Sequence, residues 1–578
     1  MFNFTGSARR PRNVNLSGRK TTTPSASTSQ KNKIAPSSSL QTAREERAAR
    51  EAERKRLKAA GTIQRTWRGR KVAEQQRQEW RAMWDGYPAD ASHAPTRISL
   101  FLACMDMGRK CKPKMWSRED LRRLDGMLLV AHVWLSDDGG DGCVPKRRWY
   151  LHRNLGRLLV EGIDSGVVKD ETLERALQVL PSLTWKVPEL VDDRYYTALS
   201  KKTASPGLSD SQLQAIVEAV VSPLQLAKGR GDAKVDAAYR AFNARYLITP
   251  DLVYLLGDRC IEKLIVGVDL RKATEFFSLT LETESKLWLL SHVVYFSRHK
   301  KEAIDLTASG LPTDREEYIK FLSMALSSVA VEVGQRIDVE DITMNDGDES
   351  DAEEDGISSK RPRGKKQPLP PFVKQQIESL VERSSVTSLL SNIKSTDGNV
   401  DILAGFALAL LLVFPARRTE MIFWLCVALT ADSVPAVKYV WNAVKKCQLY
   451  ASITSDSIAA VDPLKYPPTL PKGMSVKSIE DQWNLIFLFL EMYWCVLSTG
   501  GDHEFVQGEG HRLALSEVED LALFLKNLSF ATYWWYDDLT KSTGDDVLSK
   551  PQENGRAWEL SYFRTVVTNV LQIIYIRE

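Results

Sequence analysis

The residues of this chain that could carry acid–base, nucleophilic or metal chemistry are scattered along it. Its seven histidines include no His-x-x-x-His or His-Glu-x-x-His pair, which are spacings typical of zinc sites. Asp502-His503-Glu504 has the composition of an acid–base group, but its glycine-rich, polar surroundings favour a surface loop. The sequence contains neither a Gly-x-x-x-x-Gly-Lys phosphate loop nor a Gly-x-Ser-x-Gly nucleophile elbow. We therefore expect no catalytic residue, no metal ligand and no cofactor.

One motif indicates binding instead. Ile63-Gln64, followed after three residues by Arg68-Gly69, matches the first half of the IQ pattern, the helical motif that calmodulin-like light chains bind. Ile63 and Trp67 are one helical turn apart and can form an apolar anchor. The basic residues around them offer charge to an acidic partner.

The second half of the IQ pattern is missing. Ala73 stands where the pattern has a basic residue, and Gln76 stands where it has an apolar one. Two interpretations therefore stay open for this stretch. It either binds a calmodulin-like light chain through the half motif, or it is a basic helix that is simply solvated.

The half motif must be positioned by the stretch from Thr42 to Trp84, which we predict to be one long basic helix. Thr42 followed by Glu45 predicts a capping box at its start, and Gly86 with Pro88 predicts its end.

Charge spacing supports the same helix. Glu46 with Arg50, and Glu51 with Lys55, are predicted i,i+4 ion pairs worth about 0.2–0.5 kcal/mol each. Near the end of the helix, Trp80, Met83 and Trp84 lie on a different side from the half motif, counted at 100° per residue. We expect them to dock the end of the helix onto the next part of the chain.

Blocks of sequence at both ends of the chain carry a family resemblance. They are Met1–Gly6 (Met-Phe-Asn-Phe-Thr-Gly), Arg9–Arg19, Ile63–Gly69, Phe524–Trp534 and Leu571–Arg577. In this order they resemble the N-terminal region of HECT-type ubiquitin-protein ligases, in a fungal form of the proteasome-associated branch that contains an IQ motif. The resemblance implies a role in extending ubiquitin chains on proteasome-bound or misfolded substrates.

The same resemblance implies that catalysis belongs to a C-terminal HECT domain, whose catalytic cysteine follows a threonine. No cysteine of this chain follows a threonine, and the seven are Cys104, Cys111, Cys143, Cys260, Cys426, Cys447 and Cys495. We expect the chain alone to be inactive in ubiquitin transfer. Val566, Val567, Val570, Leu571, Ile574 and Tyr575 keep helical spacing almost to Glu578, so we also expect the chain to be truncated within a helical domain.

Composition is that of a large helical protein. The 578 residues are 43% hydrophobic and 26% charged, and the net charge of +4 is nearly balanced, which makes nucleic-acid binding an unfavoured interpretation. An odd, scattered set of cysteines and the lack of a secretory signal favour the cytoplasm, the nucleus or both.

We expect five regions along the chain. Residues 1–41 are a disordered basic tail, in which a solvated tail is favoured over RNA contacts. Residues 42–86 are the basic helix, and residues 90–340 are a helical domain. Residues 341–371 are a disordered acidic and basic linker, and residues 372–578 are a second helical domain.

The fold class follows from apolar periodicity. Leu121, Leu124, Leu128 and Ala131 form one helical stripe, and Leu287, Leu290, Val293 and Val294 form another. Pro181, Pro206, Pro223 and Pro250 are expected to punctuate successive helices. No alternating run is long enough for a sheet, so we predict an all-α protein, an irregular solenoid-like array of helices.

Charge breaks this pattern within the linker. An acidic run from Asp346 to Asp355 is followed by basic Lys360–Lys366, which is either a nuclear-import signal or plain linker. The acidic run fails as a calcium loop because Asp351 stands where glycine is required, and Asp137–Gly142 fails because Arg148 stands at the twelfth position.

Two stretches after the linker are strongly apolar. Ile402–Phe414 is short, and Glu491 interrupts Leu485–Leu497, so we expect buried core helices and no membrane span. Residues 462–471 are expected to be a loop.

Two functions remain open. The first is the non-catalytic, substrate- and partner-recruiting portion of a HECT-type ubiquitin ligase, which would contact the proteasome. The second is a calmodulin-binding helical scaffold without enzymatic activity.

Overall fold

The prediction of an all-α protein is confirmed for the part of the chain that the structure describes. The computed structural model describes residues 36–90, 92–105, 116–136, 144–228, 233–277, 282–304, 312–345, 368–386, 400–429, 435–454, 476–499, 513–534 and 560–577. These ranges contain α-helices and short 3-10 or π segments, and no strand. Residues 1–35 of the expected basic tail, the Asp346–Asp355 and Lys360–Lys366 runs, Asp137–Gly142, the 462–471 loop and Asp502-His503-Glu504 lie outside them. Residues 36–41 of the expected tail and residues 341–345 of the expected linker are helical, contrary to the prediction.

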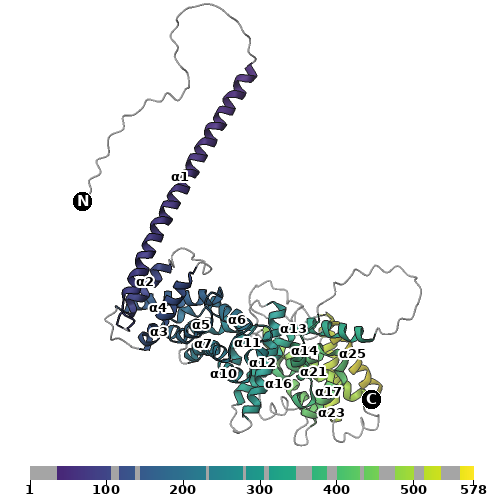
Figure 1. Cartoon of the computed structure of the whole chain (residues 1–578). Helices are drawn as coiled ribbons and strands as arrows, with labels where there is room; N and C mark the ends of the chain where they lie inside the picture. The colour runs from purple at the N-terminus through teal and green to yellow at the C-terminus, as the bar shows by residue number, and fades with distance from the viewer. Residues whose placement is uncertain are drawn as a thin grey trace, which may run out of the picture. The chain divides into compact units, whose positions relative to one another are not determined.

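Figure 1 shows the helices in their order along the chain. In the first half they are α1 (Pro36–Gly86), α2 (Ala94–Met105), α3 (Arg118–Ser136), α4 (Pro145–Asp164), α5 (Asp170–Lys186), η2 (Pro188–Leu190), α6 (Asp193–Thr203), α7 (Asp210–Lys228), α8 (Ala233–Ala241), η3 (Phe242–Tyr246), α9 (Leu252–Leu256), α10 (Asp258–Gly267) and α11 (Leu270–Phe277). In the second half they are α12 (Thr283–Ile304), α13 (Pro312–Asn345), α14 (Pro371–Ser379), α16 (Val400–Val413), η4 (Pro415–Arg417), α17 (Arg418–Leu429), α18 (Ala436–Lys446), α19 (Gln448–Thr454), α21 (Val476–Thr499), α23 (Leu515–Trp534) and α25 (Leu560–Arg577).

Contacts divide the chain into two units, Met1–Glu79 and Trp80–Glu578. The boundary falls inside α1, so most of that helix belongs to the first unit and its last turns belong to the second. Each unit is described by itself below.

The long basic helix of the first unit is present, but its predicted start is wrong. α1 begins at Pro36, so Thr42 lies in the helix and the capping box with Glu45 does not mark an N-terminus. A proline fits the first turn because the amide hydrogen it lacks would have no helical acceptor there. The predicted end at Gly86 is confirmed.

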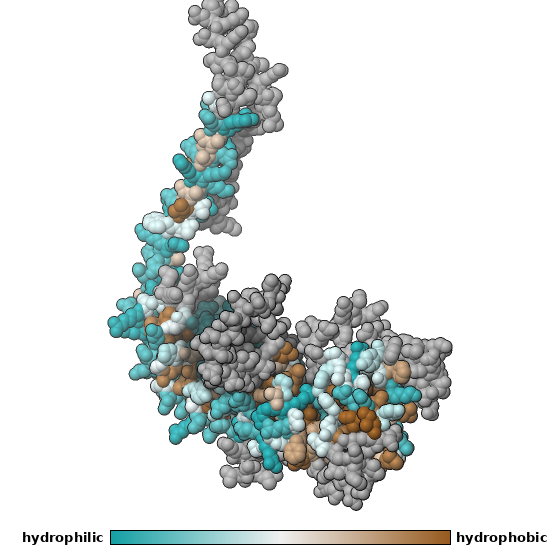
Figure 2. All heavy atoms as spheres, turned by 90° about the vertical axis from the view of Figure 1, so that its right-hand side faces the viewer, coloured by the Kyte–Doolittle hydropathy of each residue, from teal (hydrophilic) through white to brown (hydrophobic). Residues whose placement is uncertain are grey.

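The predicted ion pairs of α1 are confirmed. Arg50 pairs with Glu46 at 2.8 Å and Lys55 with Glu51 at 2.9 Å. Every side chain from Thr42 to Gln76 is exposed, and Figure 2 shows a largely hydrophilic surface along this helix with isolated apolar side chains. Exposed pairs contribute only about 0.3–0.5 kcal/mol each. The stability of this exposed helix therefore depends on interactions within its own sequence and not on packing against other helices.

In the second unit the first helices are arranged in two rows. α2, α4 and α6 pack in sequence along one row, and α3, α5, α7 and α10 pack along the other (Figure 1). The rows meet through pairs such as α2 with α3 and α4 with α5. The predicted stripe on α12 is confirmed, since Leu287, Leu290, Val293 and Val294 are fully buried. On α3, Leu124, Leu128 and Ala131 are buried and Leu121 is partly exposed.

Two of the four prolines do not punctuate helices as predicted. Pro206 and Pro250 lie between helices, but Pro181 is inside α5 and Pro223 is inside α7. An interior proline costs about 3 kcal/mol because it removes a helical hydrogen bond and crowds the preceding turn. Burial of both helices in the array, which the local sequence does not reveal, compensates for this cost.

Helices on the two sides of residues 346–367 pack against each other. α13 packs along α16, and α12 packs against α14. Phe372 of α14 lies against the rings of Trp288, stacked at a centroid distance of 6.1 Å, and of His292, at 5.5 Å. Arg336 Nη2 donates to the carbonyl oxygen of Pro368 at 2.8 Å. Trp80–Glu578 therefore forms one unit across this segment.

The apolar helices of the second half are buried, as predicted. α16 lies against α13 and α21, and Leu403, Phe406 and Leu410 of α16 are at most 3% exposed. Glu491 of α21 is 1% exposed and pairs with Arg418 at 2.7 Å. Within the described ranges no single helix is long and apolar enough to cross a bilayer, and one pair, Ile402–Val413 with Pro415–Val427, passes the length and composition test jointly while bent by 111°.

Candidate functional site

The half IQ motif lies on the solvent-exposed part of α1. Ile63 and Trp67 are 69% and 60% exposed, so two large apolar side chains one turn apart face water. Gln64 and Arg68 are exposed as well, and no atom lies within 4 Å of the position where Gly69 would carry a Cβ. The five predicted site residues thus lie on one accessible helical segment.

Local hydrogen bonds satisfy the threonine hydroxyls of this segment. The Thr62 and Thr66 hydroxyls donate to the carbonyl oxygens of Lys58 and Thr62, each at 2.9 Å. Such back-bonding ties up the polar groups of both threonines. Lys71 Nζ is 5.6 Å from the centroid of the Trp67 ring, a cation–π distance. The anchor is therefore an aromatic ring beside a cation, which suits an acidic partner with an apolar cleft.

The docking predicted for the last turns of α1 is confirmed for Trp84 and Trp80 within the second unit, but not for Met83. Trp84 is 7% exposed, Trp80 is half-buried and Met83 is 50% exposed. The Arg97 guanidinium carbon is 4.0 Å from the centroid of the Trp84 ring. Trp84 therefore anchors this end of α1, while Met83 remains accessible.

Two ion pairs fix the same turns onto α3. Arg81 Nε and Nη2 donate to the two carboxylate oxygens of Asp120 at 3.0 Å each, and Arg123 pairs in the same way with Asp85 at 3.0 and 2.8 Å. Burial acts to raise the pKa of Asp120, but hydrogen bonds from Ser117 and Arg81 outweigh it and hold the pKa below its ordinary value. Such bidentate geometry is stronger than a single contact and specifies orientation.

Three of the cysteines that the structure describes have a raised pKa. Burial raises the pKa of the Cys260 thiol, and burial with the nearby Cys495 raises the pKa of Cys426 to about 12. Burial, followed by the charge of Glu491, raises the pKa of Cys495. Catalytic cysteines need the opposite shift, because the thiolate is the attacking species.

Two of the described histidines, His292 and His93, make structural contacts. His292 is fully buried, and burial lowers its pKa to about 4 while its Nδ1 lies 2.7 Å from the carbonyl oxygen of Leu247. His93 Nδ1 lies 2.6 Å from Asp90 Oδ1, and this oxygen also accepts a hydrogen bond from the His93 amide. The two contacts together form a turn that precedes α2. No group of three or more His, Cys, Asp or Glu side chains that could hold a metal ion occurs among the described residues.

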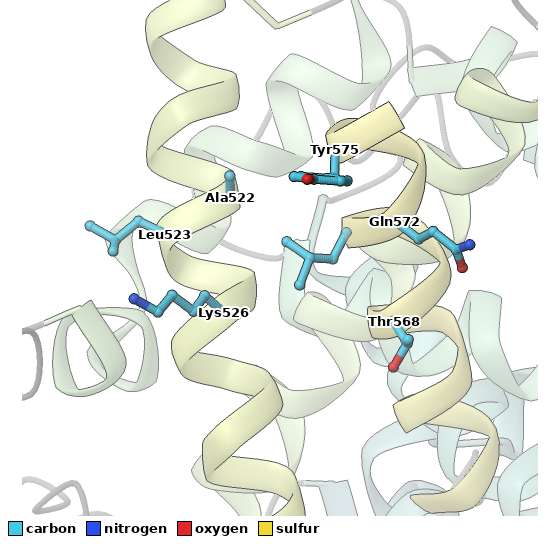
Figure 3. A pocket seen from close by; sticks show the side chains of 7 residues that line it. Ala522, Leu523, Lys526, Thr568, Gln572 and Tyr575 are labelled. Atoms are coloured by element: carbon cyan, nitrogen blue, oxygen red, sulfur yellow. The ribbon is translucent and has the colours of Figure 1, made fainter. Parts of the chain in front are cut away.

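A pocket lies between α23 and α25 (Figure 3). Its volume is about 640 Å³, and its lining is Ala522, Leu523, Lys526, Thr568, Leu571, Gln572 and Tyr575. Figure 3 shows Ala522 and Tyr575 facing the space between the two helices. The two helices also contain Phe524–Trp534 and Leu571–Arg577, the C-terminal blocks of the family resemblance, and they pack together. The titratable side chains of the lining are Lys526 and Tyr575, and the lining contains no carboxylate and no histidine.

No protein-family model, curated protein or solved structure matches this chain.

Proposed function

We propose that this chain is the non-catalytic, partner-recruiting portion of a HECT-type ubiquitin-protein ligase of the proteasome-associated branch. In this proposal α1 binds a calmodulin-like light chain, and the helical array contacts the proteasome and ubiquitination substrates. One observation carries the light-chain step. Ile63 and Trp67 are exposed one turn apart on a helix whose side chains are accessible from Thr42 to Gln76.

The chemistry of the segment supports this occupant. A helix that enters the apolar cleft of a light chain needs large anchors on one side and cations that meet acidic side chains at the rim. Ile63 and Trp67 supply the anchors, and Arg65, Arg68 and Lys71 supply the charges. The ligase part of the proposal is supported by the five blocks of resembling sequence, two of which lie on the adjacent helices α23 and α25.

The second candidate is a calmodulin-binding helical scaffold with no role in ubiquitination. The exposed half motif favours it equally, because light-chain binding does not require a ligase. The two candidates differ in whether the array binds the proteasome.

One binding experiment tests both candidates. The full chain is immobilised and incubated separately with purified calmodulin, with and without calcium, and with purified proteasomes. Retention of both supports the ligase portion, and retention of calmodulin alone supports the scaffold. If calmodulin is not retained in either calcium condition, the proposed role of α1 is wrong.

A further inference from the structure

The solvent face of α4 carries a row of cations and aromatic rings. Counted at 100° per residue, Lys146, Trp149, Tyr150, Arg153 and Arg157 fall within a sector of about 100°. Trp149 is 40% exposed and Tyr150 is 59% exposed. The Arg153 guanidinium carbon is 5.1 Å from the centroid of the Trp149 ring, which is a cation–π contact. We call these five residues the α4 face.

Among the residues that the structure describes around α4, cations outnumber acids at the α4 face. The neighbouring helix α2 contains no acidic residue. On α4 itself, Asp164 lies in the last turn and pairs with Lys201 of α6 at 2.7 Å. On α6, Asp193 pairs with Arg245 at 3.0 Å. Glu161 is the remaining acid on this side of α4, one turn beyond Arg157.

The order of charges along α4 opposes the helix dipole. The first turn of α4 contains cations and no acid, and the last turn contains Asp164 and no cation. Acids at the start of a helix and cations at its end stabilise it, so the arrangement on α4 is unfavourable at both ends. Two of the first-turn cations have partners away from the α4 face, since Arg147 Nη2 donates to Ser99 Oγ at 3.4 Å and the Arg148 guanidinium carbon is 5.5 Å from the centroid of the Trp134 ring. The remaining first-turn cation, Lys146, belongs to the α4 face.

We propose that the α4 face binds an acidic protein segment that also carries an apolar or aromatic side chain. Arginine side chains match carboxylates in bidentate geometry, and the exposed ring of Tyr150 offers apolar contact. Tryptophan, tyrosine and arginine are the residues that dominate binding energy at protein interfaces. A net charge of +4 over the chain provides little of the long-range field on which nucleic-acid binding depends. The site is separate from the half motif and goes beyond the function proposed for α1.

The test uses the full chain and a fluorescein-labelled peptide of the sequence Glu-Glu-Phe-Asp-Glu-Leu-Glu-Glu, with affinity measured by anisotropy. Because α1 is also basic, two double charge reversals are compared. Arg153→Glu with Arg157→Glu should weaken binding at least about tenfold. Arg54→Glu with Lys58→Glu, an exposed pair of equal spacing on α1 outside the half motif, should leave it within about twofold. The opposite ranking would overturn the proposal.

A second variant and a second probe sharpen the result. Tyr150→Ser keeps all charges and should weaken binding of the peptide about fivefold to tenfold, whereas replacement of Phe and Leu in the peptide by serine should remove this difference. Circular dichroism melting verifies that each variant is folded, and Tyr150→Ser decides the question if the charge reversal unfolds. A single-stranded oligonucleotide of equal charge should bind more weakly than the peptide, and tighter binding that the same substitutions abolish would make the α4 face a nucleic-acid site and overturn the proposal.

Discussion

The Tyr195 hydroxyl donates a hydrogen bond of 2.6 Å to the carbonyl oxygen of Ala219, the oxygen that Pro223 leaves without its helical donor. The amide of residue 223 would donate to residue 219 in a regular helix, but proline has no amide hydrogen. Tyr195 is fully buried, and Asp192 at the start of α6 accepts from its amide at 3.0 Å. α6 thus supplies the donor that α7 lacks.

Replacement of Tyr195 by phenylalanine should lower the free energy of unfolding by about 1–3 kcal/mol, because it leaves a buried carbonyl without a donor. Tyr196→Phe is the matched control. Its hydroxyl is 3.3 Å from the carbonyl oxygen of Val220, which the amide of Leu224 can still reach, so its loss should cost less. Pro223→Ala restores the missing donor and should reduce the cost of Tyr195→Phe. Urea unfolding of the wild type, the three single variants and the Tyr195→Phe, Pro223→Ala double mutant measures these differences. Equal costs of Tyr195→Phe in both backgrounds would contradict the assignment.

Replacement of Trp67 by alanine should weaken the binding of a calmodulin-like light chain by at least about thirtyfold, because loss of an aromatic anchor typically costs about 2 kcal/mol or more. Leu57→Ala is the matched control, since Leu57 is 67% exposed on the same helix and lies outside the half motif. Titration calorimetry with the full chain measures both affinities. Equal losses for the two variants would indicate nonspecific attraction to a basic helix.

The chain should form no thioester with ubiquitin when it is incubated with activating and conjugating enzymes. The physical reasons are the absence of a Thr-Cys pair and the raised pKa values of Cys260, Cys426 and Cys495, which keep these thiols protonated. Non-reducing gels measure the adduct. A thiol-sensitive ubiquitin band that disappears in a single Cys→Ala variant would show that one of these cysteines is reactive.

Acidification should destabilise the protein through His292. Its pKa is about 4 in the folded chain and near 6.5 in an unfolded one, so the unfolded state binds the proton more readily. The contribution of His292 to the free energy of unfolding should be fully present above about pH 7 and should fall as the pH drops below 6.5. It should level off near pH 4, after a total change of roughly 3 kcal/mol. His292→Phe removes the titrating group, so the free energy of unfolding of the wild type should fall relative to that of the variant on acidification. Parallel curves between pH 7 and pH 4.5 would contradict the prediction.

Replacement of Gly405 by alanine should destabilise the contact between α16 and α13. A Cβ at this position would lie 2.6 Å from Ser323 Oγ, which is too close, whereas the distance to Ser323 Cβ would be 3.8 Å. Overpacking of this kind typically costs about 1–3 kcal/mol. Ser323→Ala removes the clashing oxygen, so the double mutant should regain most of the lost stability in urea unfolding. If Ser323→Ala fails to rescue Gly405→Ala, the two helices do not meet at these residues.

The sequence predicted those features that depend on local periodicity. Helical stripes such as Leu287 to Val294 follow from the 3.6-residue repeat, and the different roles of Trp67 and Trp84 follow from their angular separation on one helix. The interior positions of Pro181 and Pro223 could not be predicted, because burial that compensates for a proline comes from helices distant in sequence. The start of α1 was misplaced because Thr42 and Glu45 have capping chemistry at a position that the helix passes through.

The candidate sites also differ in whether local sequence alone could predict them. The half IQ motif is contiguous, so its residues could be named from spacing alone. The α4 face was missed, because Trp149 and Tyr150 are residue types typical of a core, and only the packing of α4 against α2, α5 and α6 shows which side remains exposed. The signal available beforehand was the cluster of cations after Pro145, at the end of a helix where acids are favoured.

The packing of α13 against α16 and of Phe372 against Trp288 has a consequence for a cleaved chain. The fragments on either side of a single cut between Asn345 and Pro368 would still share a buried interface. An intact chain between these residues raises the effective concentration of one half for the other, and so governs how readily the two halves meet. It does not change the contacts that the halves make. The two halves, produced as separate polypeptides, are therefore expected to reassemble into one complex.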